Sequence, residues 1–218
     1  MDMTLAKWRL GDLAMHYPGA TAVLFKHHLD FCQASQTTLA DAAVANQLDV
    51  EALVSKLSTH HLNLEHIDGS DYLGGERIAQ LLHRYHQRHR QRFPELIRLA
   101  ERVELDNGNH LACPKGLALL LMDMQFSMEM HRQKTQHVLM SNSLSEASRS
   151  AMAPLSRVCE QAKAQLQQLE QITHQFTAPR DASITWRALY NNLQWLKRDV
   201  QQHLQLEKES LFARVEQV

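Results

Sequence analysis

The sequence contains little glycine and proline, the residues that form many of the tight turns between β-strands. Only 7 Gly and 5 Pro occur among 218 residues, which leaves few sites for the tight turns that short strands need. The glutamine, alanine, leucine, arginine and glutamate content instead favours helix. We therefore expect an all-α protein.

Two further absences narrow the class of protein. The formal net charge is −1, whereas a protein that binds nucleic acid without sequence preference needs a basic surplus. No apolar run approaches the roughly 20 residues required to span a bilayer, and the N-terminus lacks the apolar core of a signal peptide. We expect a cytoplasmic protein that binds neither nucleic acid nor membrane.

Cysteine is scarce, and common catalytic motifs are missing. Cys32, Cys113 and Cys159 are widely separated and form no CxxC pair, so we expect reduced thiols rather than a disulfide framework. Structural roles are expected for Cys113 and Cys159. The sequence contains no serine nucleophile motif, no glycine-rich phosphate loop and no HExxH motif. An ordinary hydrolase is therefore unsupported, and no catalytic residue is assigned.

Apolar spacing divides the chain into two helical regions. Residues 1–66 predict a small N-terminal domain, in which Asp49 is a suitable N-cap for the last helix. A polar, glycine-containing stretch at 67–75 predicts a linker, and residues 76–218 predict a second domain. The short helices of the first domain are expected at Leu10–Met15, Ala20–His27, Leu39–Asn46 and Val50–His60.

The second domain has the pattern of four long helices joined by short loops. Pro114 suits the first position of the second helix, and Asp181 is expected to cap the fourth. Short loops make sequential helices antiparallel, so the pattern predicts an up-down four-helix bundle. The helices are expected at about 75–104, 114–140, 146–176 and 182–215.

Polar residues interrupt the apolar stripes that should form the core of this bundle. In the fourth helix, His203 and Glu207 fall on the stripe one turn apart, which points an imidazole and a carboxylate inward. His131 interrupts the stripe of the second helix in the same way. His86 and His89 interrupt that of the first. Histidine is the commonest metal ligand, and its 14 copies here matter only where positions converge.

Distances along the helices place four of these side chains at one level of the bundle. With a rise of about 1.5 Å per residue, His86, His131 and His203 fall in the same layer, together with Glu207. Burying a carboxylate beside imidazoles costs on the order of several kcal/mol without compensation. A divalent metal removes that cost by accepting their lone pairs. We predict a metal site, with a metal-free network of Glu207 and protonated histidine as the alternative.

Several segments of the chain resemble a known family. Residues 10–14 (LGDLA), 24–26 (LFK) and 30–32 (DFC) look like its N-terminal domain. Residues 84–90 (RYHQRHR) look like its first bundle helix, and residues 203–207 (HLQLE) look like the end of its fourth. On these segments the chain resembles the hemerythrin-like di-iron proteins for repair of iron centres, the RIC or YtfE/ScdA family.

The resemblance implies a metal site that departs from the family pattern. In that family four histidines and two bridging glutamates hold two irons. Thr135 stands in place of one glutamate and Ala162 in place of one histidine. Because two cations repel each other, one bridging carboxylate supports a second ion poorly. We expect one metal ion, iron first, with zinc or manganese as alternatives. The positions that keep a ligand are His86, His131, His203 and Glu207.

Three further residues have candidate roles. His89 lies one turn beyond His86, and it is expected to support the ligands or to replace a missing one, as is Thr135. The paired cysteines of the family's N-terminal domain reduce here to Cys32, which is followed by Gln33. Cys32 is the candidate functional thiol, with a buried apolar role as its alternative.

The resemblance implies a role in iron–sulfur cluster repair under nitric oxide or oxidative stress, as a metal-binding protein more than a dedicated enzyme. The implied partners are iron–sulfur proteins, NO or O2, and a second copy of the chain. Two alternatives stay open. One is a non-catalytic regulatory or interaction relative with a vestigial or structural metal, and the other is a sensor of O2 or NO.

Overall fold

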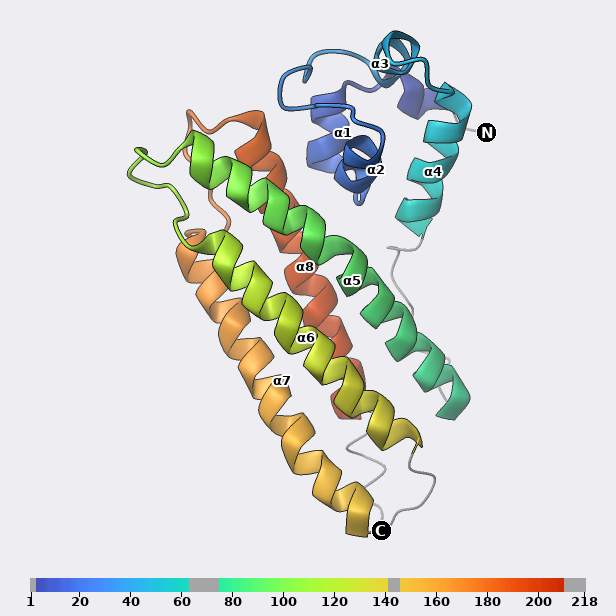
Figure 1. The fold of residues 1–218 in the computed structure, drawn as a ribbon, viewed down its shortest axis with the longest axis vertical. Helices are drawn as coiled ribbons and strands as arrows, with labels where there is room; N and C mark the ends of the chain where they lie inside the picture. Colours follow the sequence, from blue (N-terminus) through green and yellow to red (C-terminus); the bar gives the residue numbers. More distant parts are fainter. Residues whose placement is uncertain (1–2, 63–74, 141–145, 210–218) are drawn as a thin grey trace.

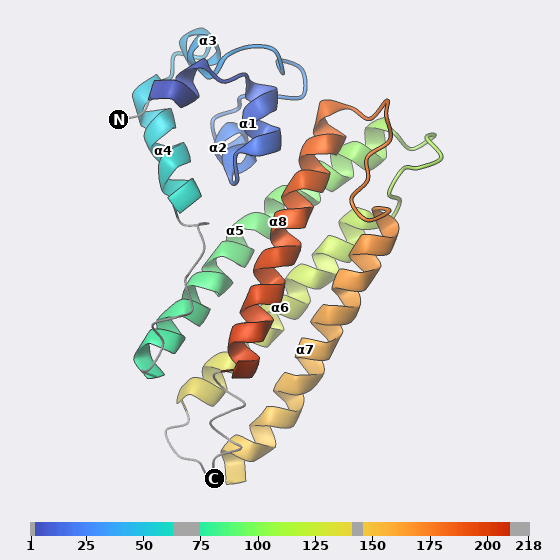
Figure 2. The same ribbon diagram turned by 180° about the vertical axis from the view of Figure 1, so that it is seen from behind.

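A computed structural model describes residues 3–62, 75–140 and 146–209 of the chain, shown from two sides in Figures 1 and 2. Within these ranges the regular elements are helices, and β-pairing is limited to one isolated bridge between Arg9 and Thr38. The all-α prediction is confirmed. No helix in the described part is long and apolar enough to cross a membrane.

The N-terminal region contains the four short helices expected from the sequence, each ending within two residues of its predicted limit. A short 3-10 helix that the sequence did not reveal, η1, precedes them. Asp49 caps the last helix as predicted, because its Oδ1 accepts hydrogen bonds from the amides of Glu51 and Ala52 at 2.9 and 3.3 Å. The elements are η1 (Met3–Lys7), α1 (Leu10–His16), α2 (Ala20–Lys26), α3 (Leu39–Ala45) and α4 (Val50–Leu62).

Four long helices form the rest of the described chain, and successive helices run in opposite directions (Figure 1). They are α5 (Gly75–Asp106), α6 (Leu117–Met140), α7 (Glu146–Ile172) and α8 (Ile184–Glu207). The predicted linker at 67–75 lies outside the described residues except for Gly75, which begins α5. Residues 210–215, which were expected to extend the last helix, also lie outside them.

Two predicted helix starts are wrong, for local reasons. α6 begins at Leu117 rather than Pro114 because Gly116 adopts a left-handed conformation, with φ 84°, just before it. The cap of α8 is Ser183, whose hydroxyl accepts from the amide of Trp186 at 3.3 Å. Asp181 instead lies 3.4 Å from the His110 ring.

The end of α7 also falls earlier than expected, at Ile172 rather than 176. Three consecutive residues, His174, Gln175 and Phe176, have φ between 48° and 58°. Left-handed backbone cannot continue a right-handed helix. The hydroxyl of Thr173 accepts a hydrogen bond of 3.2 Å from the amide of Phe176, which gives that backbone N–H a partner in this turn.

The N-terminal helices pack directly on the bundle, chiefly α1 on α8. Two side-chain amides of α8 hydrogen-bond to the end of α1. Asn192 donates to the carbonyl of Ala14 and Asn191 to that of Met15, both at 3.2 Å. The guanidinium of Arg98 lies over the ring of Phe25 at 5.5 Å. One continuous hydrophobic core therefore runs through both parts of the chain.

The bundle is packed unevenly. α6 packs extensively on α5 and α7, and α8 packs on α5, whereas α7 and α8 contact each other only lightly. A cavity of about 610 Å³ lies between α7 and α8, lined in part by Cys159, Lys163 and Leu204. This cavity reaches the buried Cys159 of α7.

Gly11 of α1 packs closely against its neighbours. A Cβ at this position would lie 3.0 Å from the Ser35 carbonyl oxygen and 3.3 Å from Cγ1 of Ile184. We expect Gly11→Ala to lower the free energy of unfolding by about 1–3 kcal/mol, because overpacking forces the neighbours apart. Urea unfolding measures this. An unchanged midpoint would show that α1 can shift at no cost.

Glu95 provides a pH-dependent test of the core. It is 4% exposed, and burial raises its pKa to about 8 against the opposing effect of Arg92 and Arg98. A carboxyl whose pKa is higher in the folded state favours folding at low pH, and this contribution is lost as pH rises from about 4.5 to 8. Glu95→Gln should therefore stabilise the protein at pH 8.5 by on the order of a few kcal/mol and have little effect at pH 4.5. Equal shifts at both values would contradict the assignment.

Candidate metal centre

Four of the sequence-predicted site residues meet in the interior of the bundle. One ligand atom from each of His86, His131, His203 and Glu207 can be chosen so that all four atoms lie within 4.8 Å of one another. They come from α5, α6 and α8. Three of the four side chains are fully buried, and His86 is 7% exposed. The structure therefore places them in one layer, as the helix levels predicted.

Helical spacing and antiparallel packing together produce this cluster. His203 and Glu207 are four residues apart on α8, which brings Nε2 of the histidine to 3.5 Å from Oε1 of the glutamate. The rings of His86 and His131 meet that of His203 edge to face, with centroids 4.7 and 5.2 Å away. Three helices thus converge on the carboxylate of the last turn of α8.

Glu207 is the centre of the polar contacts. Its Oε1 accepts a hydrogen bond of 2.7 Å from the hydroxyl of Thr135, and its Oε2 lies 2.6 Å from Nε2 of His131. The thiol of Cys159 reaches Oε2 at 3.9 Å. Burial alone would raise the pKa of Glu207, but His203 and His131 outweigh it and hold that pKa well below its usual range. The group is a carboxylate.

The imidazoles of the cluster have unused nitrogens. Within the described part of the chain, neither ring nitrogen of His131 or His203 makes a hydrogen bond of acceptable geometry, despite the short approach of His131 to Glu207. Burial, followed by repulsion from His203, lowers the pKa of His86 to about 2, so its ring is neutral. Buried polar atoms without partners are costly, and a cation that accepts their lone pairs removes that cost. The donor set therefore fits a metal ion.

His89 lies beside the cluster and is paired with a carboxylate. Its Nε2 is 3.0 Å from Oδ2 of Asp199, while its ring packs against that of His203 at 5.3 Å. Burial lowers the pKa of His89 to about 4, although Asp199 opposes the shift. Burial tends to raise the pKa of Asp199, but His89 and Arg88 reverse this and lower it. His89 is placed to support His203.

Sequence analysis missed Asp199. It is 7% exposed, and its Oδ1 lies 2.8 Å from Nη2 of Arg88. In the sequence of α8 it lies next to the line of apolar positions rather than on it, one turn before His203. The apolar spacing alone therefore predicts a surface residue. Its spacing of four residues from His203 was the signal that could have identified it.

Thr135 and Ala162, the two positions where the chain departs from the family pattern, are both buried. Thr135 is fully buried and serves Glu207 as a hydrogen-bond donor. Ala162 is buried and carries no donor atom. One turn earlier on α7, Cys159 is buried, and burial with the nearby Glu207 charge raises its pKa to about 12. The thiol is therefore protonated in the metal-free protein.

A cavity of about 350 Å³ reaches the cluster between α5 and α6. His86 and His89 form its inner wall together with Phe93. Arg132 on its outer wall donates to Glu129 at 2.6 Å. A small molecule can therefore approach His86 from this side.

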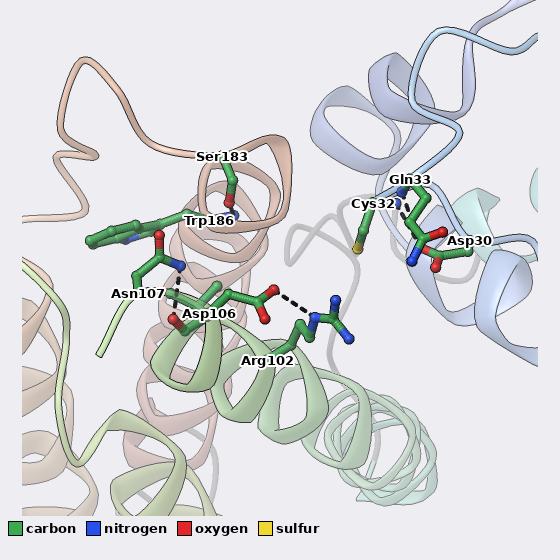
Figure 3. A network of polar contacts seen from close by, with 9 residues as sticks. Asp30, Cys32, Gln33, Arg102, Asp106, Asn107, Ser183 and Trp186 are labelled. Carbon is green, nitrogen blue, oxygen red and sulfur yellow. Dashed lines mark hydrogen bonds and ion pairs between the residues drawn. The ribbon is translucent and has the colours of Figure 1, made fainter. Parts of the chain in front are cut away.

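Cys32 lies far from the metal cluster, in the turn that follows α2. Its amide donates to Oδ1 of Asp30 at 2.9 Å, and its half-buried side chain faces Arg102 of α5 (Figure 3). Burial raises the pKa of this thiol, against the effect of a hydrogen bond from Thr185. Arg102 is 16 residues from His86 on one helix, or about 24 Å at 1.5 Å per residue. Cys32 cannot share the metal layer.

Comparison with known proteins agrees with the fold and the cluster. The profile described as "Hemerythrin HHE cation binding domain" matches residues 77–215, so the helical bundle is a cation-binding domain of the hemerythrin class. A profile named ScdA_N, described as a domain of unknown function, matches residues 6–61.

Relatives that match over nearly the whole chain are more specific. Proteins called "Iron-sulfur cluster repair protein YtfE" from Dickeya chrysanthemi and Yersinia pseudotuberculosis are 34% and 35% identical over 211 residues, which cover 94% of this chain and 95% of theirs. One from Citrobacter koseri is 33% identical over 208 residues, which cover 94% of each chain. The chain belongs to the hemerythrin-like YtfE family of iron–sulfur cluster repair proteins.

The contact between Asp199 and Arg88 predicts a large stability effect. Asp199→Asn removes the carboxylate that neutralises a buried guanidinium, so we expect it to cost about 3–5 kcal/mol of unfolding free energy. Asp106→Asn is the matched control, because Asp106 pairs with Arg102 at 2.6 Å where both side chains are about half exposed. That change should cost about 1 kcal/mol or less. Equal losses in the two variants would refute a special role for Asp199.

Proposed function

We propose that this protein is an iron-binding member of the iron–sulfur cluster repair class and that it holds one iron ion on His86, His131, His203 and Glu207. The observation that supports this most strongly is the convergence of three buried imidazoles on one buried carboxylate, with one ligand atom from each within 4.8 Å of the others. The names of the relatives support iron as the metal and cluster repair as the role.

Charge supports one ion rather than two. Two divalent ions about 4 Å apart repel each other by on the order of 16 kcal/mol at an effective dielectric constant of about 20. Glu207 is the carboxylate in the cluster, and its Oε1 is already engaged by Thr135. Ala162 provides no donor on α7. A second ion would therefore lack both ligands and compensating charge.

The donor set suits Fe²⁺ and also Zn²⁺ or Mn²⁺, since imidazole and carboxylate bind all three. When bound, iron offers an open coordination position to NO or O2, or it is itself the cargo delivered to a damaged cluster. Thr135 holds the orientation of Glu207 through one oxygen and leaves Oε2 for the ion. Asp199 holds His89 against His203 and so fixes the ring of that ligand.

Partners and location follow from the relatives and the sequence. Because the relatives are named for repair of iron–sulfur clusters, we propose that iron–sulfur proteins are the partners of this chain. A homodimer, NO or O2 as the small ligand, and a cytoplasmic location stay predictions from the sequence.

A non-catalytic, interaction-based role is the second candidate. The replacement of two family ligands by Thr135 and Ala162, together with the single Cys32, favours it over full family chemistry. The two candidates differ in whether removing the metal abolishes the repair of damaged clusters. In the non-catalytic case, a chelator leaves the repair of damaged clusters unchanged.

Metal content tests the proposed function. Protein purified without added metal should contain about one iron per chain, and His203→Ala should lose it because a buried ligand is removed. His83→Ala is the control, since His83 is exposed on the same helix as His86. Elemental analysis gives the stoichiometry, and circular dichroism shows that each variant is folded.

Three outcomes would contradict the proposal. Two irons per chain would refute the single-ion site. Iron retained by both His203→Ala and Glu207→Gln would place the metal elsewhere. An unchanged melting temperature after chelation would show that the cluster does not depend on a metal, because binding to the native state must stabilise it.

A further inference from the structure

Cys159, on α7, contacts the metal cluster through its thiol. Its Sγ lies 3.9 Å from Oε2 of Glu207, and the residue is 8% exposed. Cys32 faces Arg102 toward the other end of α5 (Figure 3), and Cys113 precedes α6 in the chain. Cys159 was expected to be structural, yet its thiol contacts the central carboxylate.

The distance between Sγ and Oε2 suits two donors on one ion. With a metal–sulfur bond of about 2.3 Å and a metal–oxygen bond of about 2.1 Å, angles of about 90–120° at the ion space the two atoms by about 3.1–3.8 Å. The observed 3.9 Å is within a small side-chain adjustment of the upper end of this range. Nε2 of His131 lies 2.6 Å from the same oxygen, is fully buried and has no hydrogen bond of acceptable geometry in the described part. The His131 imidazole therefore approaches the same carboxylate oxygen as the thiol does.

Charge gives a second reason. A divalent ion beside Glu207 alone keeps a net charge of +1 in a buried site, which low dielectric penalises. Thr135 is neutral and cannot supply the missing negative charge. A Cys159 thiolate would bring the sum of the ion and its ligands to zero.

We propose that Cys159 is a further ligand of the metal, bound through Sγ as a thiolate, so that all four bundle helices contribute a donor. This inference rests on the proposed metal site. As the metal–sulfur bond forms, the S–H bond breaks and its proton leaves to solvent, with no change of oxidation state. The cavity of about 610 Å³ between α7 and α8, which Cys159 lines, gives the proton and the ion a path.

Cobalt substitution tests this assignment through a spectroscopic signal that does not depend on activity. A thiolate ligand gives Co²⁺ an intense sulfur-to-metal charge-transfer band in the near ultraviolet, which nitrogen and oxygen ligands do not. The full-length protein loaded with one Co²⁺ should show this band. Cys159→Ser should lose it but retain the ion on the remaining ligands, and Cys113→Ser should be unchanged.

X-ray absorption of the zinc-loaded wild-type protein gives the same answer without a variant. We expect one sulfur neighbour at about 2.3 Å besides nitrogen and oxygen at about 2.0–2.2 Å. Bound metal with no sulfur neighbour and no charge-transfer band would overturn the role of Cys159 and leave the proposed function intact. Failure to bind Co²⁺ or Zn²⁺ at all would overturn both proposals.

Discussion

The structure depends on keeping one carboxylate ionised in the interior of a helical bundle. Glu207 is fully buried, and His131 and His203 hold its pKa low. Three helices must keep their axial positions for this to work, because a slip of one turn moves a side chain by about 5.4 Å. The packing of α5 on both α6 and α8 maintains those positions. The metal centre and the bundle therefore constrain each other.

Around that carboxylate, two positions lack the ligands that the family resemblance implies. Thr135 donates a hydrogen bond where the resemblance implies a second glutamate, and Ala162 leaves α7 without an imidazole. The remaining negative charge, on Asp199, is paired with Arg88 and His89 rather than directed at the ligands. A site of this composition compensates one divalent ion better than two.

The N-terminal region is attached to the opposite end of the bundle from the cluster. α1 packs on α8 near Asn191 and Asn192, and Cys32 faces Arg102 of α5 (Figure 3). About 24 Å of helix separates Arg102, beside this thiol, from His86. Any chemistry of Cys32 is therefore distinct in space from the metal centre, although one continuous core connects the two regions.

The sequence by itself determined the helices, their inward faces and the convergence of three histidines with Glu207. Apolar spacing reports the direction of each side chain about its own helix axis, and residue counts report its level. The sequence did not determine the start of α6, where Gly116 takes a positive φ, or the pairing of Asp199 with His89. Only the tertiary structure revealed that Cys159 contacts Glu207 and that it lines the cavity between α7 and α8. The rotation and separation of neighbouring helices depend on the packing of all their side chains at once, which no single helix encodes.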